Sequence, residues 1–190
     1  DEYRMDDWGI DATIISTQKG LCVSPGMSMV ILNERIIEEK VKSTKVNSIY
    51  FDFQDYLLNI KRGQTPFTPA VGIVYEILDM VQFLEQYGVE NRIQDIAERA
   101  SFYRTHIVGE GITLPDYPLS NAVTPTFFEK PVAMEVFQEL KNQFSLMVNP
   151  TGGNLADCSF RVSHVGDLSI ADNEILINRI KEIYLSKTQK

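Results

Sequence analysis

Two short apolar runs separated by a polar loop constrain the fold of this chain most. The first run is Ile10–Ile15 and the second is Met27–Leu32, with Ser16–Gly26 between them. Apolar runs of this length, bounded by turn-forming residues, indicate strands that are buried in a core. The sequence therefore predicts a buried strand, a polar loop and a second buried strand.

The polar loop contains Lys19, which precedes Gly20, and it ends with Pro25 and Gly26. A primary amine between two buried strands can be desolvated, which favours its neutral form and its use as a nucleophile towards aldehydes. The alternative is the usual state of a lysine, a solvated surface charge. The residues alone leave both interpretations open.

Helical patterns alternate with further strands along the rest of the chain. Residues 33–42 are amphipathic with Asn33 as a suitable N-cap, and residues 69–87 place apolar side chains three and four positions apart. For this second helix we expect Thr68 at the N-cap, with Pro69 at the first helical position and Gly88 at the C-terminal end. We also expect helices within 50–62 and over 91–108, 132–142 and 171–185, and strands over 121–128 and 159–165.

Composition excludes several classes of function. The net charge of −8 argues against nucleic acid and against anionic membranes as partners. No apolar run reaches the ~20 residues of a membrane helix, and the polar start of the chain predicts no signal peptide. The two cysteines and two histidines are isolated from one another, which predicts free thiols in a reducing, cytoplasmic compartment and no metal site.

Three segments, in order, carry a resemblance to a known family. They are Ser16–Gly26, with the sequence STQKGLCVSPG, Thr65–Val71, with TPFTPAV, and Phe160–Asp167, with FRVSHVGD. Together they resemble the class V pyridoxal-phosphate-dependent aminotransferases, and most closely the alanine–glyoxylate and serine–pyruvate aminotransferase branch. The resemblance extends over essentially the whole chain but covers only the C-terminal portion of such an enzyme.

The resemblance implies a fold of two parts. Residues 1–90 would be the remainder of the large cofactor domain of a fold-type I transferase, an α/β domain, and 91–190 would be the small C-terminal domain. The mixture of strands and helices after residue 90 independently favours an α+β arrangement with helices on one side of a sheet.

The resemblance also assigns site residues. Lys19 would be the catalytic lysine that holds pyridoxal 5'-phosphate as a Schiff base and moves protons. Gln18 and Thr68 would contact the cofactor phosphate. In the family, the residue matching Thr68 reaches the cofactor of the other subunit, which implies a homodimer with shared sites. From the residues alone, Thr68 could equally be an ordinary N-cap.

Arg161 is the candidate for binding the substrate carboxylate. It lies between Phe160 and Val162, and a guanidinium in this apolar context must be paired, either with a carboxylate ligand or in a structural salt bridge. The resemblance favours the ligand. His164 fits a packing or hydrogen-bonding role better than a catalytic one.

The family's ring-nitrogen aspartate, stacking aromatic residue and glycine-rich phosphate turn precede the lysine strand and lie outside this chain. We therefore expect a fragment of a transaminase that acts on alanine or serine with glyoxylate or pyruvate, and that is inactive by itself. The alternative is a non-catalytic interaction or dimerisation domain. Ser16 and Lys19 also match the Ser-x-x-Lys motif of β-lactamases, but the Ser-Asp-Asn and Lys-Thr-Gly tripeptides that this chemistry needs do not occur.

Overall fold

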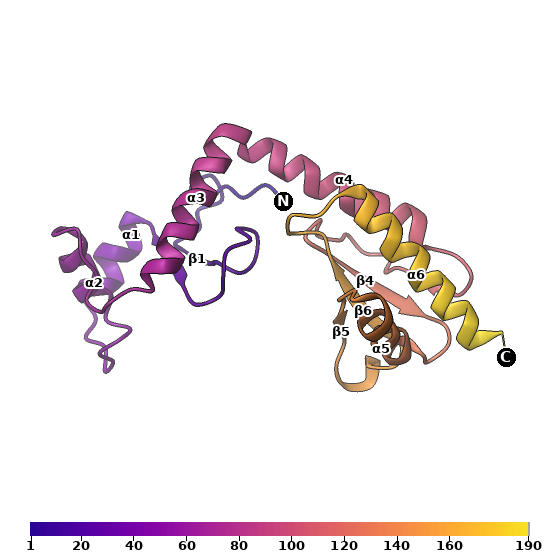
Figure 1. Ribbon diagram of the computed structural model, residues 1–190. Coiled ribbons are helices and arrows are strands. Elements are labelled where there is room, and N and C mark those ends of the chain that lie inside the picture. The colour runs from indigo at the N-terminus through magenta and orange to yellow at the C-terminus, as the bar shows by residue number, and fades with distance from the viewer. Residues whose placement is uncertain (190) are drawn as a thin grey trace. The chain divides into compact units, whose positions relative to one another are not determined.

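The computed structural model describes residues 1–189, and its contacts divide the chain into two compact units. The N-terminal unit comprises Glu2–Gln86. The C-terminal unit starts at Tyr87 and runs to the end of the described chain, together with Asp1. Each unit has its own sheet and its own helices (Figure 1).

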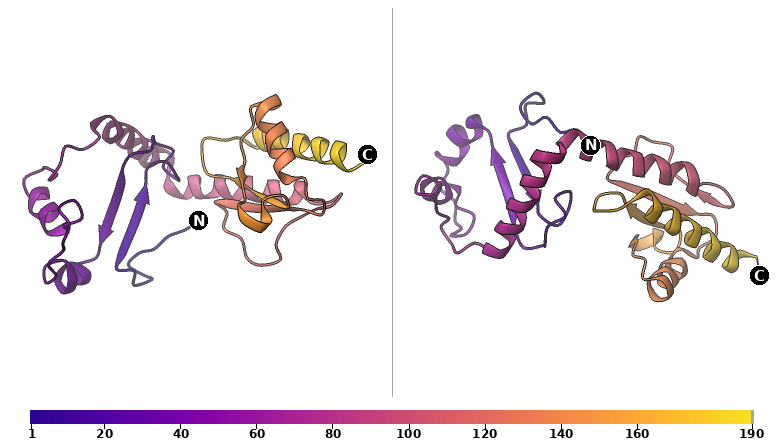
Figure 2. Two further views of the ribbon diagram at one scale, coloured as in Figure 1. Left: turned by 90° about the horizontal axis from the view of Figure 1, so that it is seen from below. Right: turned by 45° about the horizontal axis from the view of Figure 1, so that its top comes forward.

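The N-terminal unit contains a two-stranded antiparallel sheet. Strand β1 (Ala12–Ser16) pairs with β2 (Ser28–Leu32), and Ile14 lies opposite Val30 (Figure 2). Both strands lie where the sequence predicts them, within two residues at their ends. The expected burial is wrong for the described residues, because Ile14 is 71% exposed and Val30 is 40% exposed. Continuous apolar runs suit strands covered on both faces, and these two strands are not.

Two short helical segments follow the second strand. Helix α1 (Glu34–Ile36) continues as a π-helical turn, and Asn33 caps it by accepting a hydrogen bond from the Ile36 amide at 2.9 Å. Helix α2 (Phe53–Ile60) starts after Asp52, whose side chain accepts a hydrogen bond from the Gln54 amide. Both predicted helices are confirmed, and so is the role of Asn33 as an N-cap.

The long helix of the N-terminal unit begins later than predicted. Helix α3 spans Val71–Tyr87, and the Val74 amide donates to the Ala70 carbonyl at 3.1 Å. Thr68 therefore lies outside the helix, so its prediction as N-cap, with Pro69 at the first helical position, is wrong. A Thr-Pro pair is only a local preference, and the helix starts where the first i to i−4 hydrogen bond closes. Gly88 ends the helix as predicted, with a φ of 95°.

The C-terminal unit is an antiparallel sheet covered by three helices. The strand order is β3 (Ile112–Thr113), β4 (Val123–Phe128), β6 (Ser159–Ser163) and β5 (Asn149–Pro150). The helices are α4 (Val89–Ile107), α5 (Ala133–Phe144) and α6 (Ile170–Thr188). The five long elements match the predictions, whereas the two-residue edge strands were not predicted because they are too short to show a period.

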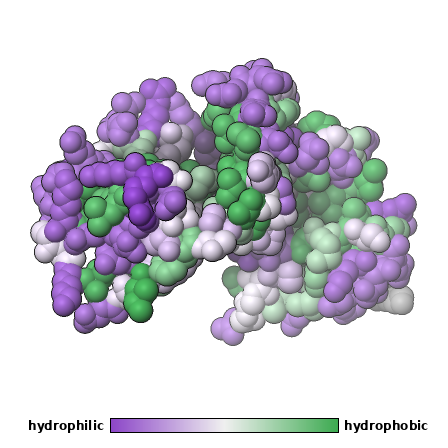
Figure 3. Space-filling model, turned by 60° about the vertical axis from the view of Figure 1, so that its left-hand side comes forward, coloured by the Kyte–Doolittle hydropathy of each residue, from purple (hydrophilic) through white to green (hydrophobic). Residues whose placement is uncertain are grey.

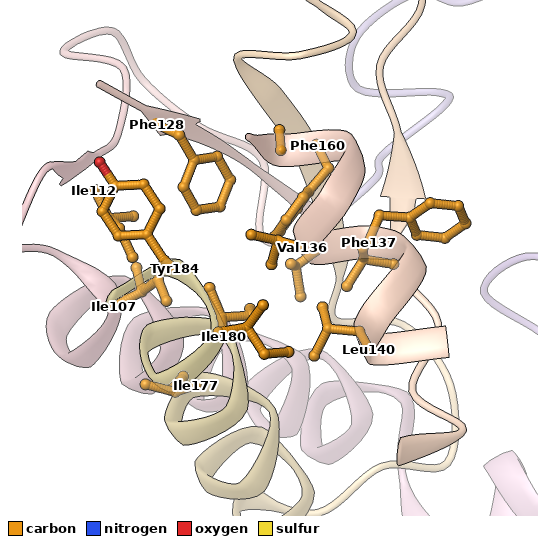
Figure 4. Packing of buried hydrophobic residues seen from close by; sticks show 14 of the residues in the cluster. Ile107, Ile112, Phe128, Val136, Phe137, Leu140, Phe160, Ile177, Ile180 and Tyr184 are labelled. Carbon is orange, nitrogen blue, oxygen red and sulfur yellow. The ribbon is translucent and has the colours of Figure 1, made fainter. Parts of the chain in front are cut away.

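The hydrophobic core of the C-terminal unit lies between the sheet and these helices (Figure 4). Phe128 and Phe160 from the two central strands meet with ring centroids 4.9 Å apart, and Tyr184 of α6 stacks near Phe128. Side chains alternate along a strand, so one face of the sheet supplies this core and the other face is left open. This places the helices on one side, in agreement with the predicted α+β arrangement.

Two kinds of feature are not found in the part of the chain that the structure describes: a membrane-spanning helix and a cluster of metal-binding side chains. None of the described helices is apolar enough over a sufficient length to cross a membrane. Among the same residues, no cluster of three histidine, cysteine or acidic side chains is arranged to hold a metal ion.

Candidate functional site

The loop that carries Lys19 is fixed from within by Thr17. This side chain is fully buried, and its hydroxyl donates to the Ser24 carbonyl at 2.7 Å and lies 3.2 Å from the Met27 carbonyl. The Thr17 backbone makes two further hydrogen bonds to the same arm of the loop. Its amide donates to the Met27 carbonyl at 3.3 Å, and its carbonyl accepts from the Val23 amide at 3.1 Å. The two ends of the loop are thus held together, and the segment that contains Lys19 projects beyond them.

Lys19 and Gln18 lie next to each other at the exposed tip of this loop. The tip is a tight turn in which the Cys22 amide donates to the Lys19 carbonyl at 3.0 Å, and Cys22 has a positive φ of 57°. Of the two interpretations that the sequence leaves open for Lys19, the described chain favours the solvated one, because Lys19 is exposed and the strands beside it are only partly covered. What the fold supplies is an accessible amine on an anchored loop.

Helix α3 contacts the opposite arm of the loop. The Ser24 amide donates to Oε2 of Glu76 at 2.9 Å. A Cβ added at Gly26 would lie 2.7 Å from Cδ1 of Ile73, so glycine permits the close approach there, where φ is 137°. Neither Thr17 nor Glu76 was predicted as a site residue. Thr17 lies inside the quoted loop motif, and Glu76 is distant from it in sequence.

Asp11, at the start of the hairpin, is fully engaged by neighbouring side chains. Nδ2 of Asn33 donates to its carboxylate at 2.7 Å, and Arg35 pairs with it at 2.6 Å. The Asn33 hydrogen bond, and to a smaller extent Arg35, lowers the pKa of this carboxyl. Asp11 therefore closes the base of the hairpin.

Thr68 lies in an exposed segment that precedes α3. The chain bends at Pro66 and Phe67, and the Thr65 hydroxyl donates to the Phe67 carbonyl at 2.6 Å. Thr68 and the lysine loop thus belong to the same unit, and α3 connects the segment of Thr68 to the contacts at Ser24 and Gly26.

Arg161 lies in the C-terminal unit, on the open face of the sheet. Phe160 and Val162 point into the core, and the intervening Arg161 points away from it, opposite Pro125 on β4 and Asn149 on β5. The apolar environment inferred for Arg161 is wrong, because its side chain is exposed, whereas its pairing with a carboxylate ligand stays a prediction. Its apolar sequence neighbours occupy the other face of the strand, because side chains alternate with a period of two.

His164 follows the same strand and is completely buried. Its Nε2 lies 2.8 Å from the Thr124 hydroxyl, and Nδ1 has no hydrogen-bond partner among the described groups. Burial, reinforced by the charges of Arg104 and Arg99, lowers the pKa of His164 to about 4. The structure confirms His164 as a packing and hydrogen-bonding residue.

Arginines of α4 hold the loops at the ends of the two central strands. Arg99 is 5% exposed and donates to the carbonyls of His164 at 3.1 Å and Leu168 at 2.9 Å. Arg104 donates to the Thr124 hydroxyl at 2.9 Å and to the Ser120 carbonyl at 2.6 Å. These contacts fix the end of the strand that carries Arg161.

The chain is similar in sequence and in fold to known proteins. No protein-family model matches the chain. Serine–glyoxylate aminotransferase of Arabidopsis thaliana is 25% identical over 173 residues, which are 88% of this chain and 43% of that protein. The chain thus spans less than half the length of this relative.

Two solved structures share the fold of the chain. Alanine–glyoxylate aminotransferase from Nostoc sp. has a TM-score of 0.83 and 24% identity, over 94% of this chain and 49% of that one. Ureidoglycine–glyoxylate aminotransferase from Bacillus subtilis has a TM-score of 0.85 and 24% identity, over 100% of this chain and 50% of that one. The predicted fold class is therefore confirmed. The chain is similar in sequence and in fold to proteins named as glyoxylate aminotransferases, and it spans about half of their length.

Proposed function

We propose that this chain is the C-terminal portion of a pyridoxal-phosphate-dependent transaminase. The observation that carries the proposal is the accessible amine of Lys19 on a loop anchored by Thr17, in a chain whose relatives are named as aminotransferases. The chain would transfer an amino group between a small amino acid and a 2-oxo acid once it is joined to the remaining half of such an enzyme.

In this proposal, residues 1–90 form the remainder of the large cofactor domain and residues 91–190 form the small C-terminal domain. The division of contacts between Gln86 and Tyr87 supports a boundary in this region. The C-terminal unit has a closed hydrophobic core of its own, as a separate small domain requires.

The donor set of the lysine loop suits pyridoxal phosphate. The aldehyde of this cofactor requires a primary amine, which Lys19 supplies, and its phosphate requires neutral N–H and O–H donors, which Gln18 and Thr68 supply. When bound, the cofactor provides an electron sink for the bond that breaks at the substrate's α-carbon. Lys19 would anchor the cofactor and accept and return the α-proton, at its amine nitrogen.

Arg161 would bind the substrate carboxylate. Its planar guanidinium can donate two parallel hydrogen bonds to a carboxylate, and it is exposed on the open face of the sheet. The strand behind it is fixed by the core on one side and by Arg99 at its end, so the side chain is presented by a rigid support.

The relatives narrow the substrate class. The three relatives described above are named serine–glyoxylate, alanine–glyoxylate and ureidoglycine–glyoxylate aminotransferase. We infer alanine or serine as donor and glyoxylate or pyruvate as acceptor. Residues 69–74, after Thr68, contain no cation that could bind a phosphonate, which disfavours aminoethylphosphonate.

We further propose that the enzyme is a cytoplasmic homodimer with shared active sites. Support for the dimer comes from the exposed position of Thr68 ahead of α3, which leaves it free to reach a neighbouring subunit's cofactor. Support for the compartment comes from the two cysteines, which form no disulfide in the described chain.

The test uses the full-length protein with added pyridoxal phosphate. We expect an absorbance band for the lysine-bound cofactor that Lys19→Ala abolishes, and that Lys61→Ala, which removes an exposed lysine elsewhere in the same unit, preserves. Alanine–glyoxylate or serine–glyoxylate turnover should depend on the same lysine. A band that survives Lys19→Ala would refute the proposal.

A further inference from the structure

Two independent contacts fix the far arm of the lysine loop. Thr17 holds the Ser24 carbonyl at 2.7 Å from inside the hairpin, and Glu76 accepts from the Ser24 amide at 2.9 Å from helix α3. The backbone carbonyl and the backbone amide of Ser24 are therefore held by two different side chains. A residue held at both its carbonyl and its amide has little freedom to rotate, so Ser24 fixes the path of the loop after Lys19.

The Glu76 contact joins segments that are far apart in the chain. The two residues are separated by 52 positions, and Ile73, nearly one turn before Glu76 on α3, is the side chain that approaches Gly26. Helix α3 thus meets the loop at two adjacent points, one polar and one apolar.

The Glu76 carboxylate is held in its ionised form by this contact. The hydrogen bond from the Ser24 amide lowers the pKa of Glu76, and desolvation opposes this shift. The interaction is thus a local bond between a carboxylate and a backbone amide.

We propose that Glu76 is a positioning residue for Lys19. The inference rests on the proposed role of Lys19 as the lysine that holds the cofactor. Glu76 touches neither the amine nor the cofactor. It fixes the loop arm at Ser24, and through the turn closed by the Cys22 amide it sets where the Lys19 side chain leaves the loop.

Three variants test this in the purified 190-residue chain. Glu76→Ala removes the acceptor, Glu76→Gln keeps an acceptor oxygen but removes the charge, and Asp79→Ala removes an exposed carboxylate from the same helix as a matched control. The first measurement is hydrogen exchange of the Ser24 amide by nuclear magnetic resonance. We expect exchange to be about threefold faster or more in Glu76→Ala, since a single hydrogen bond shifts a local equilibrium by a few-fold. Glu76→Gln should be intermediate, and Asp79→Ala unchanged.

The second measurement is the rate at which Lys19 is acetylated by acetic anhydride, with each lysine followed separately by mass spectrometry. We expect this rate to change by about threefold in Glu76→Ala, with Glu76→Gln closer to the parent chain and Lys61 unaffected in all variants. An unchanged Ser24 amide would refute the hydrogen bond. A changed Ser24 amide with unchanged Lys19 acetylation would refute the positioning role.

Both measurements are made without cofactor, so their outcome is separate from that of the proposed function. If the full-length protein lacked a Lys19-dependent absorbance band, the proposed function would fail while the Ser24 and Lys19 results still stood. If the band were present but Ser24 and Lys19 did not respond to Glu76→Ala, only the role of Glu76 would fail.

Discussion

The imidazole of His164 and the hydroxyl of Thr124 lie 2.8 Å apart inside the core of the C-terminal unit. The ring is completely buried, its second nitrogen has no described partner, and the charges of two arginines act on it. Protonating this ring requires a charge to be placed where no acceptor is available. The neutral form is therefore the one that the folded state accepts.

This burial predicts a loss of stability in acid. The pKa of His164 is about 4 in the folded chain and 6.5 in the unfolded one, so the unfolded state binds more protons between these values. The contribution of neutral His164 to the free energy of unfolding is fully present above pH 6.5 and is lost as the pH falls towards 4. The loss is roughly 2 kcal/mol at pH 5. Urea unfolding at pH 7 and pH 5 measures it. The difference in the free energy of unfolding between pH 7 and pH 5 should be smaller in His164→Gln. It should be unchanged in His106→Gln, which replaces an exposed histidine. An equal difference in the two variants would contradict the prediction.

The arginines of the C-terminal unit should separate into structural and non-structural groups. Arg99→Ala leaves the buried carbonyl of His164 and the partly buried carbonyl of Leu168 without their Arg99 donors, and we expect a loss of about 2–4 kcal/mol in the free energy of unfolding. Arg161→Ala removes an exposed side chain, and we expect a change below about 0.5 kcal/mol. Denaturant unfolding compares the two variants directly. A large loss for Arg161→Ala would show that it is structural.

Arg161 should matter for substrates instead. In the full-length enzyme, Arg161→Lys replaces a guanidinium that can donate two parallel hydrogen bonds by a single ammonium. The change should weaken the binding of every amino-acid substrate by about 1.5–3 kcal/mol. The cofactor absorbance should stay the same, because the proposed role concerns the substrate alone. Steady-state kinetics with alanine and serine provide the measurement, and unchanged kinetics would remove Arg161 from the substrate site.

Thr17 offers a test of the loop anchor. Thr17→Val keeps the shape of the buried side chain but leaves the Ser24 and Met27 carbonyls without the hydroxyl donor. We expect a loss of about 1–3 kcal/mol in stability of the N-terminal unit, since the fully buried side chain loses its hydrogen bond to the Ser24 carbonyl. Thr17→Ser, which retains the hydroxyl, should lose clearly less. Hydrogen exchange of the backbone amides of residues 17 and 23 reports the local stability of the N-terminal unit. Equal exchange rates in the valine and serine variants would contradict the expected role of the hydroxyl.

The 190-residue chain by itself should fold, associate with itself and lack transaminase activity. The C-terminal unit has a complete core, but the N-terminal unit exposes large apolar side chains, some of which are visible in Figure 3. They include Ile14 at 71%, Ile49 at 84% and Phe51 at 67% exposed. Exposed apolar patches and an open strand edge favour association.

Sedimentation velocity over a range of protein concentrations measures this association. Ile14→Thr combined with Val30→Thr, on facing positions of the hairpin, should reduce it while leaving the circular dichroism of the chain unchanged. A strictly monomeric chain, or one with measurable alanine–glyoxylate turnover, would show that the missing half is less necessary than we propose.

The sequence predicted elements better than it predicted their surroundings. Period and breakers located the two strands around the lysine loop and the cap at Asn33, because these signals are local. They could not show that Ile14 is exposed, because an apolar run does not specify what covers it. The error at Arg161 has the same origin, since Phe160 and Val162 are its neighbours in sequence but lie on the opposite face.

The contacts that hold the candidate site were the least accessible to sequence reasoning. The bond between Glu76 and Ser24 spans two elements and has no periodic signal. Thr17 stood inside the recognised motif, but a threonine before a lysine has many ordinary explanations. The start of α3 shows the limit of local rules, because Thr68 had suitable residues after it and the helix still began at Val71.

The alternation of side chains along β6 has a consequence for how such an enzyme can diversify. Phe160, Val162 and His164 carry the core, whereas Arg161 and Ser163 face outwards from the same strand. Substitutions at the outward positions can change what the open face recognises at little thermodynamic cost. With Arg161 kept in the proposed role for the carboxylate that all amino acids share, Ser163 is the outward position of β6 at which recognition can change while the inward positions keep the scaffold constant.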